Sequence, residues 1–400
     1  MPDSSRPASN ILAGLSALGH AARDALVRSV SAGPLAVQLY DGFRSPEGVF
    51  VVGRVMEDPE LAPADAEQST WTNFFAMVRR ANARGAPHAV VRLDAGGDAI
   101  EITADDEGFF QATIAVRAPR RIDDEWVRVD AEVVKPRAPA VPIRRSGRAL
   151  VPGAPPKLMV ISDIDDTVLQ SKVTNLLVAA RTIAFGNART RLPFPGVAAF
   201  YQALRRGRSA GERNPIFYIS SSPWNLYDVI KQFLEIQGIP DGPLMLRDLD
   251  ITLDVLASSR HRAHKGAMIK RVLEAMPNVP VVLIGDSGQQ DPEIYRDVVR
   301  EYPGRVVAVY IRNVTMNAER SQAIGRLADE VLADGSSLVL ADDTLAAAKH
   351  AAEHGFIDPA SLASIGAEKK ADEGVRGGKQ DAPGARDAAD KPTPTVVVEK

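Results

Sequence analysis

A short apolar run that ends in three carboxylates constrains this chain most. Residues 158–162 read as a buried β-strand, and Asp163, Asp165, Asp166 and Thr167 follow at its carboxyl end. Carboxylates this close together repel one another, and burying them is costly unless a cation or hydrogen-bond donors compensate. A hard divalent cation prefers oxygen ligands. The run therefore predicts a Mg²⁺ site at the carboxyl end of a strand in an open α/β sheet.

The remainder of the C-terminal half alternates between strand-like and helical patterns. The predicted strands are 158–162, 216–219, 244–246, 281–284, 306–311 and 337–340. The predicted helices are 197–206, 226–237, 265–275, 294–301 and 345–354. This alternation indicates βαβ units, so we expect an α/β domain with a mostly parallel sheet over residues 158–357.

The N-terminal half has a different pattern. Short strand-like runs separated by turn residues predict a β-sandwich over residues 35–135, with a helix at Trp71–Arg80 inserted between strands. The remaining segments are predicted from composition and periodicity to be an amphipathic N-terminal helix (1–34), a proline-rich linker (136–157) and a disordered tail (366–400). The N-terminal helix has two interpretations, a helix packed on a domain and an interfacial membrane helix.

Composition excludes several classes of function. The 400 residues contain no cysteine, which excludes disulfides, thiolate metal sites and a cysteine nucleophile. A formal net charge of −3 gives no reason to expect nucleic-acid binding. No apolar run is long enough to span a membrane, and the N-terminus does not resemble a secretory signal. The expected location is the cytoplasm, with peripheral contact at a membrane surface left open.

Polar residues placed beyond the predicted strands point to one site. Ser220 follows the strand 216–219, Lys265 stands near a helix start, and Asp286 and Asp291 follow the strand 281–284. Because the carboxyl ends of parallel strands meet at one edge of a sheet, we expect these side chains to meet the D-x-D-x-T run. Ser221 is the alternative to Ser220. Asp166 is better read as a loop residue than as a ligand.

Four stretches resemble the motifs of the haloacid dehalogenase superfamily of phosphohydrolases, in the same order and in the expected strand or helix context. They are the D-x-D-x-T run, Ser220, Lys265 and Gly285–Asp291. The resemblance implies that Asp163 is the nucleophile and Asp165 the general acid and base. It also implies Mg²⁺ held by Asp163, the backbone carbonyl of Asp165 and Asp286, with Ser220 and Lys265 binding the phosphoryl group. The supporting residues would be Thr167, which braces the loop, and Asp291, which holds Lys265 or a metal-bound water.

A narrower resemblance rests on longer runs. Four runs look like the catalytic domain of the actin-patch-associated phosphatidate phosphatase family. They are Ser162–Val168 with Ser171, Tyr218–Tyr227, Gly285–Tyr295 and Tyr310–Arg312. That family uses Mg²⁺ to convert phosphatidate to diacylglycerol. Substrate-binding candidates at these positions and in the basic stretch before Lys265 are Ser221, Trp224, Asn225, Arg260 and Arg262.

The spacing of the motifs also bears on the size of the substrate. Between Asp163 and Ser220 there is room only for a small helical cover at 176–191, so the cap is small or absent. An open site of this kind favours a phosphorylated lipid or another bulky phosphomonoester. Two alternatives stay open: a phosphatase of soluble metabolites or phosphoproteins, and an inactive phosphatase-like binding module.

Overall fold

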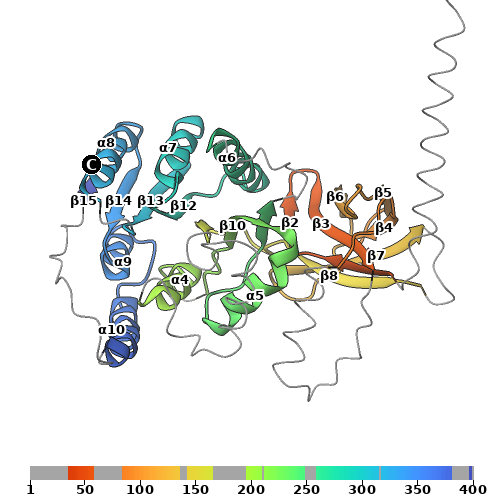
Figure 1. Ribbon diagram of the computed structural model, residues 1–400, viewed down its shortest axis with the longest axis horizontal. Helices are drawn as coiled ribbons and strands as arrows, with labels where there is room; N and C mark the ends of the chain where they lie inside the picture. The colour runs from red at the N-terminus through yellow and green to blue at the C-terminus, as the bar shows by residue number, and fades with distance from the viewer. Residues whose placement is uncertain are drawn as a thin grey trace, which may run out of the picture.

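A computed structural model describes residues 35–57, 83–135, 142–164, 195–209, 211–247, 258–314, 317–380 and 396–398. An N-terminal sheet and a C-terminal sheet flanked by helices lie next to each other (Figure 1). The predicted helices 1–34 and Trp71–Arg80 and the cover segment 176–191 lie outside the described residues.

The N-terminal sheet has its strands in the order β1-β3-β2-β8-β7-β4-β5, with β6 paired to β3. The strands are β1 (Leu35–Leu39), β2 (Gly42–Ser45), β3 (Gly48–Glu57), β4 (Val90–Asp94), β5 (Ile100–Thr103), β6 (Phe109–Ile114), β7 (Trp126–Lys135) and β8 (Arg144–Leu150). Val51 and Phe110 from one half of this sheet share a core with Leu93 and Val129 from the other half. The halves enclose a core as a sandwich does, but pairing of β2 with β8 joins them.

Strand β8 corrects the prediction of a linker over 136–157. It pairs antiparallel with β7, from Trp126 opposite Leu150 to Glu132 opposite Arg144. Sequence periodicity missed it because the side chains at 144–146 are all exposed, so the usual apolar alternation is absent. The strand therefore belongs to the sheet rather than to an extended connection.

The C-terminal sheet has the order β11-β10-β9-β12-β13-β14-β15, parallel except for β15. The strands are β9 (Met159–Asp163), β10 (Ile216–Pro223), β11 (Leu244–Arg247), β12 (Val281–Asp286), β13 (Val306–Arg312), β14 (Ser337–Ala341) and β15 (Val396–Val398). The chain runs outward from β9 to β11 and returns to β12 on the other side of β9. The strand order therefore reverses between β9 and β12, which is where open α/β sheets bind ligands. The predicted α/β class with a parallel sheet is confirmed.

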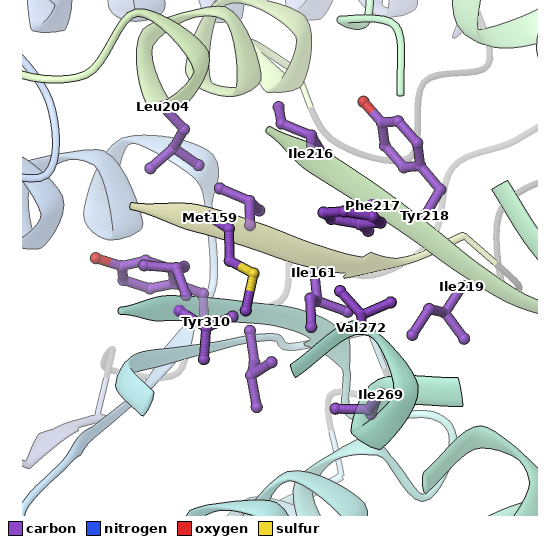
Figure 2. Packing of buried hydrophobic residues seen from close by; sticks show 14 of the residues in the cluster. Met159, Ile161, Leu204, Ile216, Phe217, Tyr218, Ile219, Ile269, Val272 and Tyr310 are labelled. Atoms are coloured by element: carbon purple, nitrogen blue, oxygen red, sulfur yellow. The ribbon is translucent and has the colours of Figure 1, made fainter. Parts of the chain in front are cut away.

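Helices cover both faces of this sheet, with α6, α7 and α8 on one face and α4, α5 and α9 on the other (Figure 1). The helices are α4 (Val197–Arg206), the 3₁₀ turn η2 (Trp224–Leu226), α5 (Tyr227–Ile236), α6 (Ser258–Ala275), α7 (Asp291–Glu301), α8 (Ala318–Ala333), α9 (Thr344–Glu353) and α10 (Ser361–Gln380). Figure 2 shows Ile269 and Val272 of α6 and Leu204 of α4 packed on opposite sides of β9. Burial on both faces explains why the strands read as continuous apolar runs.

Helix α10 and strand β15 show that the predicted disordered tail 366–400 is wrong for 366–380 and for 396–398. Glu368 accepts a hydrogen bond from the Ala199 amide at 3.0 Å, and Asp372 accepts one from the Gly196 amide at 2.9 Å. These acids satisfy amides at the N-terminus of α4. Ile365 anchors the first half of the helix in the hydrophobic core, and beyond it these polar contacts hold residues 366–380, so composition alone did not reveal the helix.

The two sheets are joined by a common hydrophobic contact. Phe43 of β2 meets Phe217 of β10 edge to face at 5.4 Å, and both belong to one buried cluster. Tyr40 stacks on Trp224 at 4.7 Å. Within the described part of the chain, no helix has the length and apolar character needed to cross a membrane.

Candidate active site

Three carboxylates converge where the strand order reverses. Asp163 ends β9, Asp286 ends the neighbouring strand β12, and Asp291 begins α7. One carboxylate oxygen from each lies within 4.8 Å of the other two. All three side chains are buried. Carboxylates at this separation repel strongly in a buried setting.

Lys265 brings one positive charge into this group. Its ammonium lies 2.6 Å from Asp163 Oδ1 and also contacts Asp291 Oδ1, and its side chain is 1% exposed. We call Asp163, Asp286, Asp291 and Lys265 the acid cluster. Its three carboxylates outnumber its one ammonium, so the cluster itself favours an additional cation.

The loop between β12 and α7 has the conformation that its two acids require. The Gly288 and Gln289 amides donate to Asp286 Oδ1 at 2.7 and 3.1 Å, and the Asp286 amide donates to Asp291 Oδ2 at 3.1 Å. A Cβ at Gly285 would lie 2.4 Å from Asp291 Oδ2. Only glycine at this position allows Asp291 to approach the strand so closely.

Ser220 lies beside the acid cluster on the adjacent strand. Ile219 is opposite Asp163 in the parallel register, so Ser220 stands one residue further toward the carboxyl end. Ser220 is 1% exposed, and its hydroxyl accepts the Ser222 amide at 3.0 Å. Strand β10 continues to Pro223, so Ser220 and Ser221 are both part of it.

The structure describes only some of the other residues that were predicted for the site. Asp165 and Thr167 lie outside the described residues, as does the side chain of Arg260. Arg262 forms an ion pair with Asp297. Trp224, in η2 with Asn225, is 4% exposed and stacks on Tyr40, so its ring packs against the N-terminal sheet. This position argues against the predicted substrate contact by Trp224.

A mainly apolar cavity opens beside Asp163 and Asp286. Its walls come from α4, β12, β13, β14 and α9, and Arg312 adds a guanidinium. Tyr201 lines the cavity, and its hydroxyl lies 2.6 Å from Ser162 Oγ. Burial raises the pKa of Tyr201 to about 12, so the phenol stays neutral near the acids. This cavity suits the apolar part of a ligand whose polar end reaches the acid cluster.

Sequence reasoning missed Arg320, on α8. Its guanidinium donates to the carbonyls of Ser287 and Gln289 in the loop that holds Asp286 and Asp291. No motif marked this arginine, because its loop partners are backbone atoms 31 and 33 residues away and its side-chain partner Glu293 is 27 residues away. A single sequence gives no signal for such a contact.

Comparison with known proteins gives a match over the segment that contains the acid cluster. Residues 158–313 match the family model described as "Phosphatidate phosphatase APP1, catalytic domain". The chain is 29% identical over 155 residues to phosphatidate phosphatase APP1 of Saccharomyces cerevisiae, an alignment that covers 38% of this chain and 25% of the relative. It is 26% identical over 163 residues to an uncharacterized protein of Schizosaccharomyces pombe, covering 39% of this chain and 25% of the relative.

Among solved structures, a carbohydrate acetylesterase from Xanthomonas citri is similar at 10% identity with a TM-score of 0.24, over 74% of this chain and 73% of that one. A similarity at that score does not bear on function. The curated relatives are matched over about a quarter of their own length. All four residues of the acid cluster fall within the segment similar to the phosphatidate phosphatase catalytic domain.

Proposed function

We propose that this chain is a Mg²⁺-dependent phosphomonoesterase of the haloacid dehalogenase type that converts phosphatidate to diacylglycerol and phosphate. The observation that supports this most is the acid cluster at the strand ends of the segment similar to a phosphatidate phosphatase catalytic domain. The parallel sheet with Asp163 on a central strand supports the same proposal.

The donor set fits Mg²⁺. It consists of carboxylate oxygens, which hard cations prefer, and it carries more negative than positive charge. The carboxylates of Asp163 and Asp286 are the proposed ligands, together with the backbone carbonyl of Asp165, a residue outside the described part of the chain. When bound, Mg²⁺ would neutralise charge on the phosphoryl oxygens.

The protein's own groups would carry the reaction in two displacements. In the first, an oxygen of Asp163 attacks phosphorus, the bond from phosphorus to the glyceride oxygen breaks, and Asp165 gives that oxygen a proton. In the second, Asp165 takes a proton from water, whose oxygen attacks phosphorus and releases phosphate from Asp163. Lys265 would balance charge on the phosphoryl group, and the Ser220 hydroxyl would donate to one of its oxygens.

The direct test is release of phosphate from phosphatidate in detergent micelles. We expect activity with Mg²⁺, none after chelation, and a loss of more than about a thousandfold in Asp163→Asn. Brief reaction with phosphatidate labelled in the phosphate, followed by acid quenching, should leave label on the wild-type protein only. Full activity in Asp163→Asn would contradict the nucleophile assignment.

A substrate panel decides between lipid and soluble substrates. The apolar lining of the cavity beside Asp163 supports a substrate with an acyl or glyceride part. We therefore expect kcat/KM for phosphatidate to exceed that for glycerol 3-phosphate and for a phosphoserine peptide. Equal or higher values for the soluble compounds would favour a metabolite or phosphoprotein phosphatase. No turnover of any compound would favour the binding-module alternative.

A further inference from the structure

We infer that Arg320 positions the acid cluster by holding the loop of residues 287–290 from outside. Arg320 lies on α8, beyond residue 313, where the similarity to the family model ends. The inference deepens the proposed function, on which its kinetic readouts rest, and it adds a residue that does not touch the proposed substrate.

The planar guanidinium of Arg320 donates hydrogen bonds both to this loop and to Glu293. Its Nε donates to the Ser287 carbonyl at 2.9 Å, and Nη2 donates to the Gln289 carbonyl at 2.6 Å. Nη2 also donates to Glu293 Oε2 at 3.1 Å, and Nη1 donates to the other oxygen of that carboxylate. One side chain thus binds two loop carbonyls and the first turn of α7. Such a planar fork fixes orientation as well as distance.

One of these two peptide units faces the acid cluster on its other side. The Ser287 carbonyl and the Gly288 amide belong to one peptide plane, and that amide donates to Asp286 Oδ1 at 2.7 Å. Arg320 therefore binds the oxygen end of a dipole whose N–H end holds Asp286. A cation on the carbonyl polarises the peptide and strengthens its amide as a donor.

Arg320 is itself held in place. The side chain of Asn317 accepts the backbone amides of Glu319 and Arg320 at 2.8 and 3.2 Å and so caps α8. The hydrogen bonds that Arg320 donates to Glu293, together with the charges of Glu293, Asp286 and Asp291, outweigh burial and raise the pKa of Arg320. The arginine is thus anchored on a helix and coupled electrostatically to both acids of the loop.

The loop has a physical need for such a support. Asp163, Asp286 and Asp291 hold carboxylate oxygens within 4.8 Å of one another. Mutual repulsion favours outward movement of the loop, and each outward movement would remove an oxygen from the proposed metal site. A displacement of about 1 Å at such a site is enough to reduce catalysis strongly. Arg320 opposes this movement without adding a ligand.

The test compares Arg320→Gln with Arg300→Gln in the full chain. Arg300 joins α7 to α8 through Glu330 and Asp334 but does not bind the loop, so its variant controls for loss of helix packing. The measurements are calorimetric titration with Mg²⁺ alone, the Mg²⁺ dependence of kcat and KM on phosphatidate, and thermal melting. Arg320→Lys keeps the charge without the fork.

We expect Arg320→Gln to weaken Mg²⁺ binding about tenfold and to lower kcat about tenfold, with KM within twofold of wild type. Arg300→Gln should stay within twofold on every measure. Arg320→Lys should fall between wild type and Arg320→Gln, and it decides the question if the glutamine variant does not fold. Equal Mg²⁺ binding in Arg320 and Arg300 variants would overturn the inference.

The two proposals fail in distinguishable ways. If the wild-type chain binds Mg²⁺ but releases no phosphate from any substrate, the proposed function fails and calorimetry still decides the role of Arg320. If the wild-type chain binds no Mg²⁺, both are overturned.

Discussion

Two groups of buried and half-buried charges in the described part of the chain differ in their balance of acids and cations. At the contact between the sheets, an interdomain cluster joins Asp41, Arg148, Lys231 and Asp241. Arg148 binds both oxygens of Asp41 at 2.9 and 3.0 Å, and Lys231 lies 2.8 Å from Asp41 Oδ2. Two acids there meet two cations. In the acid cluster, three acids meet one ammonium.

This difference in charge balance distinguishes a cluster that stabilises the fold from one that fits a binding site. Burial opposes charge on Asp241, yet Lys231 and Arg148 more than offset it and lower the pKa of that carboxyl. The interdomain cluster therefore needs no further ion. The acid cluster has a surplus of carboxylates that no core would retain for stability alone, and such a surplus fits a site that binds a cation.

Removing the single ammonium of the acid cluster should have the largest effect. Lys265→Met leaves three buried carboxylates together, so we expect the metal-free protein to lose about 3–5 kcal/mol of unfolding free energy and at least about a hundredfold in kcat. Urea unfolding with and without Mg²⁺ measures the first, and phosphate release measures the second. At the interdomain cluster Arg148 still serves both acids, so Lys231→Met should lose less. A larger loss there would refute the contrast.

Replacing an aspartate by asparagine should change the stability of the protein in opposite directions in the two clusters. Asp286→Asn keeps the oxygen that accepts two loop amides but removes a repelling charge, so the metal-free protein should be stabilised by about 1 kcal/mol. Asp41→Asn removes a charge that two cations need, so it should destabilise by about 1–3 kcal/mol.

Thermal melting of both variants tests this pair. Mg²⁺ should raise the melting temperatures of wild type and of Asp41→Asn, and it should not raise that of Asp286→Asn. Destabilisation of metal-free Asp286→Asn to the level of Asp41→Asn would mean that the acid cluster carries no charge surplus.

An aromatic contact beside the interdomain cluster joins the two sheets. We expect its loss to affect activity less than a change in the acid cluster. Tyr40 stacks on Trp224 at 4.7 Å and meets Tyr227 at 4.7 Å, two to five residues beyond Ser222. We expect Tyr40→Ala to cost about 3 kcal/mol of unfolding free energy and to lower kcat a few-fold by loosening the end of β10. Tyr40→Phe keeps the ring and should lose less than half as much. Unchanged kcat in Tyr40→Ala would show that the N-terminal sheet does not support the site.

The sequence predicted those parts that local patterns determine. Apolar runs located β9, β10 and β12, and the polar residues after them located Asp163 and Asp286 at one edge. Residues fixed by long-range polar contacts were missed. Strand β8 lacks the alternation of apolar residues that marks a strand. Arg320 donates to a backbone carbonyl, which every residue carries whatever its type. Trp224 looked like a cleft residue because its stacking partner Tyr40 lies far away in the chain.

The smallest expected effect concerns a buried group that is kept neutral rather than paired with a charge. His350 is 3% exposed, and its Nδ1 lies 2.9 Å from the hydroxyl of Tyr310. Burial, with a smaller contribution from His354, lowers the pKa of His350 from 6.5 to about 4. Between these values the unfolded chain binds a proton that the folded chain does not, so stability falls as pH falls from about 6.5 toward 4. We expect wild type to lose at most about 2 kcal/mol between pH 7 and pH 5 by urea unfolding. His350→Gln should show a smaller loss over the same interval, and an equal loss would assign the pH dependence to groups other than His350.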